Sequence, residues 1–251
     1  MNDKSSFHAR CALVTGASGA IGGAVARRLA KDGFRIAVCF WQSETKAQAL
    51  KTELLASHGE GIAEIFQADL SQKGAAEDLF SKVHTHFGRV DALFNNAGAT
   101  QPGPLASLDD EAYERVFATN TYASFALLRQ AARQLADHGR IVSTSSTVVS
   151  SPILGSSLYA ASKAGLELLT IVSSKELAAR AITANALRVG PTVPGLFELA
   201  PAERRNAMAA AAPFKRLGQP NDTADVVAFL MSEAGAWITG QVITVDGGIT
   251  G

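Results

Sequence analysis

The sequence has no excess of charge of either sign, because 23 lysine and arginine residues balance 23 aspartate and glutamate residues. A neutral chain without a basic cluster creates no overall field that would attract nucleic acid or an anionic membrane surface. Long apolar runs are absent as well, and none approaches the ~20 residues needed to cross a bilayer. The sequence therefore predicts neither a nucleic acid partner nor a membrane partner.

Cysteine is scarce, since the chain has only Cys11 and Cys39, with no CxxC pair and no histidine-rich cluster. This pattern predicts no metal site. The first ten residues, MNDKSSFHAR, are polar and lack the apolar core of a signal peptide. We therefore expect a cytoplasmic location, where thiols stay reduced.

Short apolar runs rich in β-branched residues alternate with longer helical patterns. The expected strands are residues 11–16, 35–40, 61–70, 90–98, 139–146, 182–189 and 240–247. The expected helices are residues 21–33, 43–59, 71–88, 108–139, 159–180 and 222–236. This alternation is typical of an α/β fold, here a doubly wound parallel seven-stranded sheet (Rossmann fold) of order 3-2-1-4-5-6-7. With 47% hydrophobic residues and neither linker nor repeat, residues 1–251 are expected to form a single domain.

The two cysteines fall on neighbouring strands of this sheet, Cys11 at the start of the first and Cys39 near the end of the second. An offset of about four residues at ~3.3 Å each separates them by roughly 13 Å. A disulfide needs Cα atoms within ~7 Å. Both cysteines are therefore expected to be buried and reduced.

Helix ends are marked by serines and glycines. The expected N-terminal caps are Ser43, Ser71 and Ser107, and the expected stops are Gly33, Gly59 and Gly88. Residues 191–217 interrupt the alternation and are long for a connection. Such an insertion is typical of a lid or a substrate wall, the alternative being a disordered segment.

The stretch TGASGAIG, residues 15–22, follows the first strand and opens the first helix. Gly16, Gly19 and Gly22 allow a tight turn that approaches a pyrophosphate, while the helix N-terminus offers free N–H groups. Thr15 and Ser18 could add hydroxyl donors. The spacing differs from GxGxxG, and a glycine turn without a ligand is the alternative.

The second strand ends with Phe40, where an NAD site usually has an acidic residue. A missing carboxylate removes repulsion against a 2′-phosphate, which Ser43 at a helix start could receive. This favours NADP over NAD, although no lysine or arginine stands at the usual clamping places. Asp69 could accept from the adenine amino group or cap the next helix, a role that Ser71 could fill instead, and the Asn/Gly turn at residues 95–98 faces the ligand crevice.

Tyr159 and Lys163 lie four residues apart in SSLYAASKAG, so a helix places them on one face. Taken alone, this is a surface pair. The whole set of motifs, however, resembles the short-chain dehydrogenases/reductases, in the single-domain branch of about 250 residues that includes 3-oxoacyl-carrier-protein reductase-like members. The motifs are TGASGAIG, ADL, NNAG, ATN, GRIVSTSS, YAASK and WITGQVITVDGG, in that order between about residues 10 and 250.

The resemblance implies a catalytic tetrad of Asn120, Ser146, Tyr159 and Lys163. Tyr159 would be the acid in reduction and the base in oxidation, Ser146 would orient the substrate oxygen, and Asn120 would hold a water. An adjacent ammonium and a positive nicotinamide both favour a phenolate, so Lys163 is expected to lower the pKa of Tyr159 and to bind the nicotinamide ribose. The alternative for Asn120 is a buried amide that satisfies the backbone.

The resemblance also implies a cofactor site. Its residues would be Gly16, Ser18, Gly19, Ala20, Ile21, Phe40, Ser43, Asp69, Leu70, Asn96, Ala97, Gly98, Tyr159, Lys163, Gly190 and Thr192. Two departures concern this site: Ala20 stands where the family's glycine loop has its middle glycine, and Val189 and Pro194 replace a proline and a threonine after the sixth strand.

A mostly apolar substrate pocket is expected. Its wall would consist of Ser146, Ile153, Leu154, Leu158, Val193, Leu196 and Phe197, with no cation dedicated to a carboxylate; the direction of Arg188 is open. The sequence thus predicts an NADP(H)-dependent oxidoreductase acting on a small-molecule ketone or secondary alcohol. The resemblance implies a homotetramer, or a homodimer. A catalytically silent dinucleotide-sensing protein of the same fold is the alternative, and an epimerase or dehydratase would need a larger substrate domain.

Overall fold

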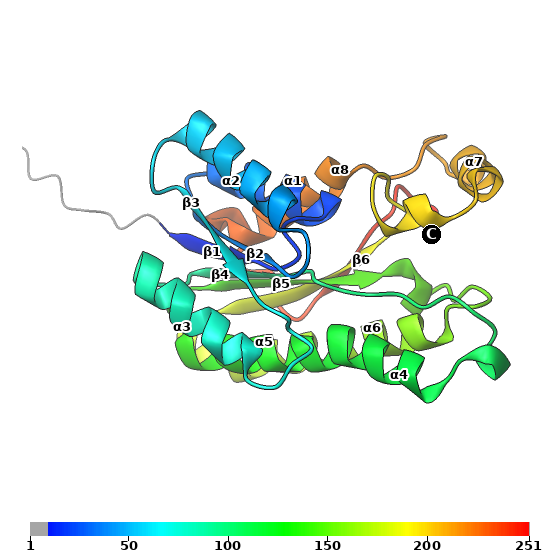
Figure 1. Cartoon of the computed structure of the whole chain (residues 1–251), viewed down its shortest axis with the longest axis horizontal. Coiled ribbons are helices and arrows are strands. Elements are labelled where there is room, and N and C mark those ends of the chain that lie inside the picture. The colour runs from blue at the N-terminus through cyan, green and yellow to red at the C-terminus, as the bar shows by residue number, and fades with distance from the viewer. Residues whose placement is uncertain (1–9, 251) are drawn as a thin grey trace, which may run out of the picture.

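The computed structural model describes residues 10–250, apart from the side chain of residue 199 (Figure 1). The predictions for residues 1–9 and 251 lie outside the described residues. Seven parallel strands form one sheet in the order β3-β2-β1-β4-β5-β6-β7, as predicted. The strands are β1 (Cys11–Val14), β2 (Arg35–Phe40), β3 (Ala63–Gln67), β4 (Ala92–Asn95), β5 (Arg140–Ser146), β6 (Thr183–Val189) and β7 (Val242–Val245).

Helices cover both faces of the sheet (Figure 1). One layer contains α1 (Ala20–Lys31), α2 (Glu44–His58) and α8 (Pro220–Met231), and the other contains α3 (Ala75–Phe87), α4 (Asp110–Phe117), α5 (Ala123–Gln134) and α6 (Ser157–Glu176). Alternate residues of β1 supply the two cores: Ala12 and Val14 pack with α1, whereas Cys11 and Leu13 pack with α3 and α5. This period-two alternation is what a strand covered on both faces requires.

The cysteine prediction is confirmed. Cys11 is in register with Arg35, so Cys39 lies four residues further along the neighbouring strand. Both thiols are free and buried. Burial raises the pKa of each to about 12, which keeps them protonated and unreactive at neutral pH.

The predicted helix starts are only partly right. Ser43 occupies the N-cap position of α2, although its side chain makes no capping hydrogen bond. Ser71 is no cap, because α3 begins later, at Ala75, after Gly74 in a left-handed conformation. Ser107 belongs to a short 3₁₀ turn, and Asp109 caps α4 instead by accepting from the N–H of Ala112 at 2.8 Å. The stops at Gly59 and Gly88 are confirmed, and α1 ends two residues before Gly33.

The long helix expected over residues 108–139 is divided. Between α4 and α5 the chain forms a π-helical segment, Ala118–Tyr122, which contains Asn120. A π-helical turn of this kind inside a helix is frequently found at a functional site.

Residues 191–217 form an ordered excursion. A bridge between Thr192 and Gly218 closes its base. Within it lie a 3₁₀ turn, Leu196–Leu199, and helix α7 (Ala202–Ala211), none of whose side chains is buried. The segment thus contains regular secondary structure, and its role as a lid or substrate wall stays a prediction.

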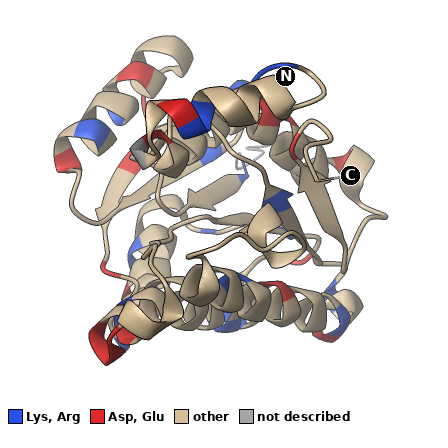
Figure 2. Cartoon of the chain, turned by 90° about the vertical axis from the view of Figure 1, so that its right-hand side faces the viewer, with Lys and Arg blue, Asp and Glu red and all other residues tan. Residues whose placement is uncertain are grey.

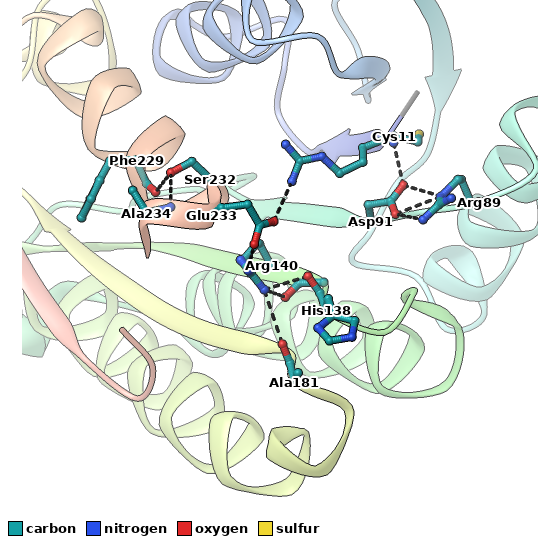
Figure 3. Close-up of polar contacts among 12 residues, drawn as sticks. Cys11, Arg89, Asp91, His138, Arg140, Ala181, Phe229, Ser232, Glu233 and Ala234 are labelled. Atoms are coloured by element: carbon teal, nitrogen blue, oxygen red, sulfur yellow. Dashed lines mark hydrogen bonds and ion pairs between the residues drawn. The ribbon is translucent and has the colours of Figure 1, made fainter. Parts of the chain in front are cut away.

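Polar contacts tie together the amino-terminal edge of the sheet (Figure 3). Asp91 accepts from the N–H of Cys11 at 2.8 Å and pairs with Arg89, which joins β1 to β4. The buried Arg140, at the start of β5, donates to the carbonyl of His138 at 2.7 Å and lies 3.6 Å from Glu233. Contacts between residues of the chain itself therefore occupy this edge of the sheet. The candidate site lies at the opposite edge.

Candidate active site

The predicted site residues gather at the carboxyl-terminal edge of the sheet. The glycine turn follows β1, Phe40 ends β2, Asn96 follows β4, Ser146 ends β5 and Gly190 follows β6. In open α/β sheets, ligands bind at this edge, where the strand order changes direction. In Figure 2, which views the molecule from this side, blue and red segments are interspersed without a large area of one sign.

The glycine turn has the geometry of an anion cradle. Gly16 has a φ of +64°, and a Cβ at Gly22 would lie 2.3 Å from the carbonyl oxygen of Gly16. Only glycine fits that close approach between helix and turn. Gly19 caps α1, a twelve-residue helix whose first N–H groups point out of the turn. Ser18 and Ile21 are half-buried beside it.

Thr15 does not offer its hydroxyl to a ligand. Its side chain is fully buried and donates to the carbonyl of Phe94 at 3.1 Å. The same oxygen accepts from the N–H groups of Asn96 at 2.8 Å and Ala97 at 3.1 Å. Thr15 therefore fixes the turn after β4 against β1, and its role as a donor to the cofactor was wrongly predicted.

At the adenosine end of the predicted site, only some of the predicted residues are accessible to a ligand. Phe40 is 3% exposed and packs in the core below α1 and α2, so its side chain is not presented to a ligand. Ser43 is exposed at the start of α2, with its hydroxyl unused by the cap. Asp69 accepts from the N–H of Ser71 at 3.1 Å and from its hydroxyl at 2.6 Å, in a turn that ends before α3 begins at Ala75, so it does not cap that helix. The neighbouring Leu70 is buried.

The Asn/Gly turn after β4 joins three strands. The side-chain amide of Asn96 donates to the carbonyl of Thr15 at 3.1 Å, and its oxygen accepts from the hydroxyl of Thr144 at 3.1 Å. A Cβ at Gly98 would lie 3.1 Å from Asn120 Oδ1 and 3.2 Å from Lys163 Nζ. The absence of a side chain at Gly98 therefore lets the turn lie directly on two residues of the predicted tetrad. Sequence reasoning missed Thr144, and no sequence signal marks it.

Asn120 is fully buried in the π-helical segment. Its Oδ1 accepts from the N–H of Ala99 at 2.8 Å, and its Nδ2 donates to the carbonyl of Ala99 at 2.8 Å and to Ser162 Oγ at 2.9 Å. Both N–H groups of the amide are therefore used, which matches the backbone-satisfying alternative. One lone pair of Oδ1 remains for a water.

Tyr159 lies in the first turn of α6 beside Ser146 at the end of β5. Burial raises the pKa of Tyr159, and a hydrogen bond with Ser146 acts in the opposite direction. The expected lowering of this pKa is therefore wrong for the free protein, because loss of solvent outweighs the hydrogen bond.

Lys163 lies one turn further along α6 and is 2% exposed. Its Nζ donates to the carbonyl of Thr144 at 2.7 Å and lies 5.9 Å from the ring centre of Tyr159. Burial lowers the pKa of Lys163 to about 8. An ammonium has three donors, so two are left for a ligand with hydroxyl acceptors, such as a ribose.

Gly190 and Thr192 lie at the base of the excursion. A Cβ at Gly190 would lie 2.6 Å from the Cβ of Asp246, so the chain passes β7 there only without a side chain. Thr192 is 7% exposed and donates its hydroxyl to the carbonyl of Gly190 at 3.0 Å. Because its proton is used in this bond, the Thr192 hydroxyl can only accept a hydrogen bond from a ligand.

The predicted substrate wall is only loosely assembled. Leu154 is completely exposed, and Ile153 and Leu196 are 40% and 52% exposed. Leu158 and Phe197 are half-buried. Two surface cavities near the excursion have volumes of about 360 and 300 Å³, and Val193 is the one predicted wall residue that lines them.

Charged and polar residues also line these cavities. The larger is lined by Ala20, Ala24, Arg27, Val193, Pro194, Gln219, Pro220 and Asn221. The smaller is lined by Val193, Glu198, Arg205, Asn206, Ala209 and Leu217. The expected purely apolar lining therefore does not describe either cavity. Ala20 faces the larger one, so its methyl group is accommodated beside the glycine turn.

Arg188 is not available to a substrate carboxylate. Its guanidinium donates from Nε to Glu167 Oε1 and from Nη2 to Glu167 Oε2, both at 2.8 Å. Between residues 10 and 250 no group of three or more histidine, cysteine, aspartate or glutamate side chains is placed to hold a metal ion. No helix in that range is long and apolar enough to cross a membrane.

Comparison with known proteins gives full-length matches. Residues 16–250 match the family profile described as enoyl-(acyl carrier protein) reductase. The short chain dehydrogenase/reductase nsrJ of Aspergillus novofumigatus is 35% identical over 95% of each chain. The 3-oxoacyl-[acyl-carrier-protein] reductase FabG of Staphylococcus epidermidis is 35% identical over 96% of this chain and 98% of its own.

A solved structure gives the same result. The crystal structure of a short chain dehydrogenase from Burkholderia cenocepacia J2315 in complex with NADP has a TM-score of 0.91 and 35% identity, covering 96% of this chain and 98% of that one. Fold, motif order and full-length sequence similarity agree. The chain belongs to the short-chain dehydrogenase/reductase family of oxidoreductases.

Proposed function

We propose that this protein transfers a hydride between NADP(H) and a ketone or secondary alcohol, with Tyr159 as the general acid/base. The observation that carries the proposal is the grouping of Tyr159, Ser146 and Lys163 at the sheet edge, beside the glycine turn. The Ser146 hydroxyl is close enough to Tyr159 to lower the pKa of its phenol, and the Lys163 ammonium lies 5.9 Å from the phenol ring.

The residues present fit a nicotinamide dinucleotide. The turn at Gly16 and the free N–H groups of α1 suit a pyrophosphate, and the two remaining donors of Lys163 suit a ribose. Ser43 is exposed where a 2′-phosphate would lie, and no acidic side chain stands at the end of β2 to repel it. The NADP bound to the Burkholderia relative supports the same choice.

When bound, the cofactor supplies or accepts the hydride at the substrate carbon. The chain's own residues handle the proton. In reduction, Tyr159 Oη gives its proton to the substrate oxygen, and the Lys163 ammonium stabilises the phenolate that remains. Ser146 donates to the same oxygen and fixes its orientation. Asn120 fixes the backbone at Ala99, and its free lone pair holds a water through which Tyr159 regains a proton.

The substrate is proposed to be a mostly apolar small molecule. Arg188, the cation nearest the end of β6, is paired with Glu167 and does not select a carboxylate. FabG by its name reduces 3-oxoacyl groups on a carrier protein. A ketone, free or carrier-bound, is consistent with these observations.

The protein is further proposed to act in the cytoplasm as a homotetramer, or a homodimer. Phe125 on α5 and Leu168 and Val172 on α6 are 42%, 65% and 51% exposed, which is unusual for large apolar side chains of one helix layer. Burial against a second copy would remove these surfaces from water. Size-exclusion chromatography with light scattering measures the assembly directly.

The test of function is a panel of ketones and secondary alcohols with NADPH and NADH, followed by absorbance at 340 nm. We expect turnover with NADPH, and Tyr159→Phe should abolish it while leaving NADPH binding nearly unchanged. A silent dinucleotide-sensing protein would instead bind NADPH without turning over any substrate. Persisting activity in Tyr159→Phe would show that another group moves the proton.

A further inference from the structure

Glu167 is a buried carboxylate that the proposed chemistry does not use. It lies on α6 and is 5% exposed. Its Oε1 accepts from Ser145 Oγ at 2.6 Å and from Arg188 Nε at 2.8 Å, and its Oε2 accepts from Arg188 Nη2 at 2.8 Å. Three charge-assisted hydrogen bonds therefore hold this side chain from two directions.

The two partners of Glu167 belong to adjacent strands. Ser145 on β5 and Arg188 on β6 are register partners, so their side chains lie next to each other on one face of the sheet. One carboxylate thus spans the seam between β5 and β6. The next residue of β5 after this contact is Ser146.

The same face of α6 carries the reacting groups. Tyr159, Lys163 and Glu167 follow one another at intervals of four residues, so they stack along one side of the helix. Lys163 binds the carbonyl of Thr144 and Glu167 binds Ser145, while Tyr159 faces Ser146. Two successive strand residues therefore hold two successive turns of α6, beside the pair Ser146 and Tyr159.

Stability alone does not account for a buried ion pair at this place. Replacing a buried pair by well-packed apolar residues is often neutral or stabilising. The pair instead fixes the orientation of Glu167, because a planar guanidinium bonded at two points fixes both the distance and the rotation of its carboxylate. Helix α6 can neither turn nor slide without breaking these bonds.

We propose that Glu167 and Arg188 are positioning residues: their ion pair holds α6 on the β5–β6 seam and so keeps Tyr159 aligned with Ser146. This inference rests on the function proposed above. It assigns to the pair no contact with substrate or cofactor, and its effect reaches the reaction only through the placement of α6.

The first test uses Glu167→Gln, which keeps the shape and removes the charge, and Arg188→Lys, which keeps the charge and removes the two-point bond. A shift of about 1 Å in reacting groups costs on the order of 100-fold in rate. We expect kcat to fall about 10- to 100-fold while KM changes less than threefold. The matched control is Glu53→Gln, which breaks a two-point pair with Arg27 on the far side of the sheet and should leave kcat unchanged.

The second test separates positioning from stability. The double variant Glu167→Leu/Arg188→Leu replaces the pair by apolar side chains and should recover most of the melting temperature lost by Glu167→Gln. If the pair positions α6, kcat stays low in spite of that recovery. Recovery of kcat together with the melting temperature, or single variants within twofold of the parent, would overturn the inference.

A third readout needs no turnover. Ionisation of Tyr159 is followed by phenolate absorbance after a stopped-flow pH jump, as the difference from Tyr159→Phe. Ser146 lowers the pKa of Tyr159, so a weaker contact between them in Glu167→Gln should move the titration of Tyr159 to higher pH than in the parent. If Tyr159 titrates at the same pH in Glu167→Gln and in the parent, the inference is contradicted, whether or not the parent is active. If the titration shifts but the parent has no activity, the positioning role stands and the proposed function does not.

Discussion

The ammonium of Lys163 lies 5.9 Å from the ring centre of Tyr159, yet in the free protein its hydrogen bond goes to the carbonyl of Thr144. The two groups are therefore stacked without a direct bond. Burial acts on both and disfavours charge on each, since it raises the pKa of the phenol and lowers that of the amine. Without cofactor, the phenol of Tyr159 is therefore neutral and lies beside the Lys163 amine, whose pKa is lowered.

This arrangement predicts a pH-dependent stability. Lys163 has a pKa of about 8 when folded and 10.5 as its ordinary value, so between these values the unfolded chain binds more protons. Stability from this group therefore rises with pH across that window. Relative to Lys163→Met, the parent should gain on the order of 3 kcal/mol in free energy of unfolding between pH 8 and 10.5.

Urea denaturation at several pH values, without nucleotide, measures this difference. The two buried cysteines also ionise on unfolding, but they are common to both proteins and cancel. Lys46→Met, at an exposed site of α2, is the control and should show no such slope. A constant difference between parent and Lys163→Met would mean that the lysine is solvated in the folded state.

The glycine turn makes a steric prediction. A Cβ at position 22 would lie 2.3 Å from the Gly16 carbonyl and 2.8 Å from the Cα of Ala17. Gly22→Ala should therefore lower the free energy of unfolding by about 1–3 kcal/mol, as overpacking does. It should also weaken NADPH binding, because the turn must open to make room for the methyl group. Thermal denaturation and fluorescence titration with NADPH report the two effects.

The control for that substitution is its neighbour. A Cβ at Gly23 would lie 3.2 Å from the end of the flexible Arg27 side chain and 3.3 Å from the carbonyl oxygen of Ala17, so it overlaps neither as a Cβ at position 22 would. Gly23→Ala should therefore cost clearly less than Gly22→Ala, because the gain in helix propensity of up to about 1 kcal/mol offsets the tight contact with Ala17. Equal losses in the two variants would show that any side chain in this turn is harmful, whatever its contacts.

Cofactor choice depends on Ser43 in a testable way. If its exposed hydroxyl receives the 2′-phosphate, Ser43→Ala should weaken NADPH binding about tenfold, the size of a hydrogen bond to a charged group, and leave NADH binding unchanged. Ser57→Ala, at the other end of the same helix, should change neither. Equal affinities of Ser43→Ala and the parent for NADPH would place the phosphate elsewhere.

Strand order and the position of the site follow from the sequence because they depend on patterns of many residues. Seven apolar runs alternating with helices allow few topologies, and parallel strands bring their carboxyl ends to one edge. Helix starts depend on one or two residues at the start of each helix. Ser71 was predicted as a cap, yet its hydroxyl binds Asp69 two residues earlier, and Asp109 replaced Ser107. Such local competition has no signature in the residue pattern.

The partners of the site residues depend on contacts between distant segments. Nothing near Asn120 in the sequence indicates that its amide binds Ala99, and nothing near Glu167 indicates Arg188, 21 residues away. Phe40 was identified through its position at a strand end, but which face a side chain takes there depends on core packing. The candidate site residues could thus be named from the sequence, whereas the contacts that hold them in place could not.

Asn120 gives a final prediction, because its structural role and its proposed catalytic role should have effects of different size. Asn120→Ala leaves the N–H and carbonyl of Ala99 without their partner, and burying such groups unpaired costs about 1–3 kcal/mol. The free energy of unfolding should fall by that amount, while Thr119→Ala, in the same π-helical segment, should change little. The specific activity of the folded Asn120→Ala protein should also fall, because the proposed water site beside Lys163 is lost together with the amide. If the specific activity of the folded fraction equals that of the parent, Asn120 serves only to hold the turn at Ala99.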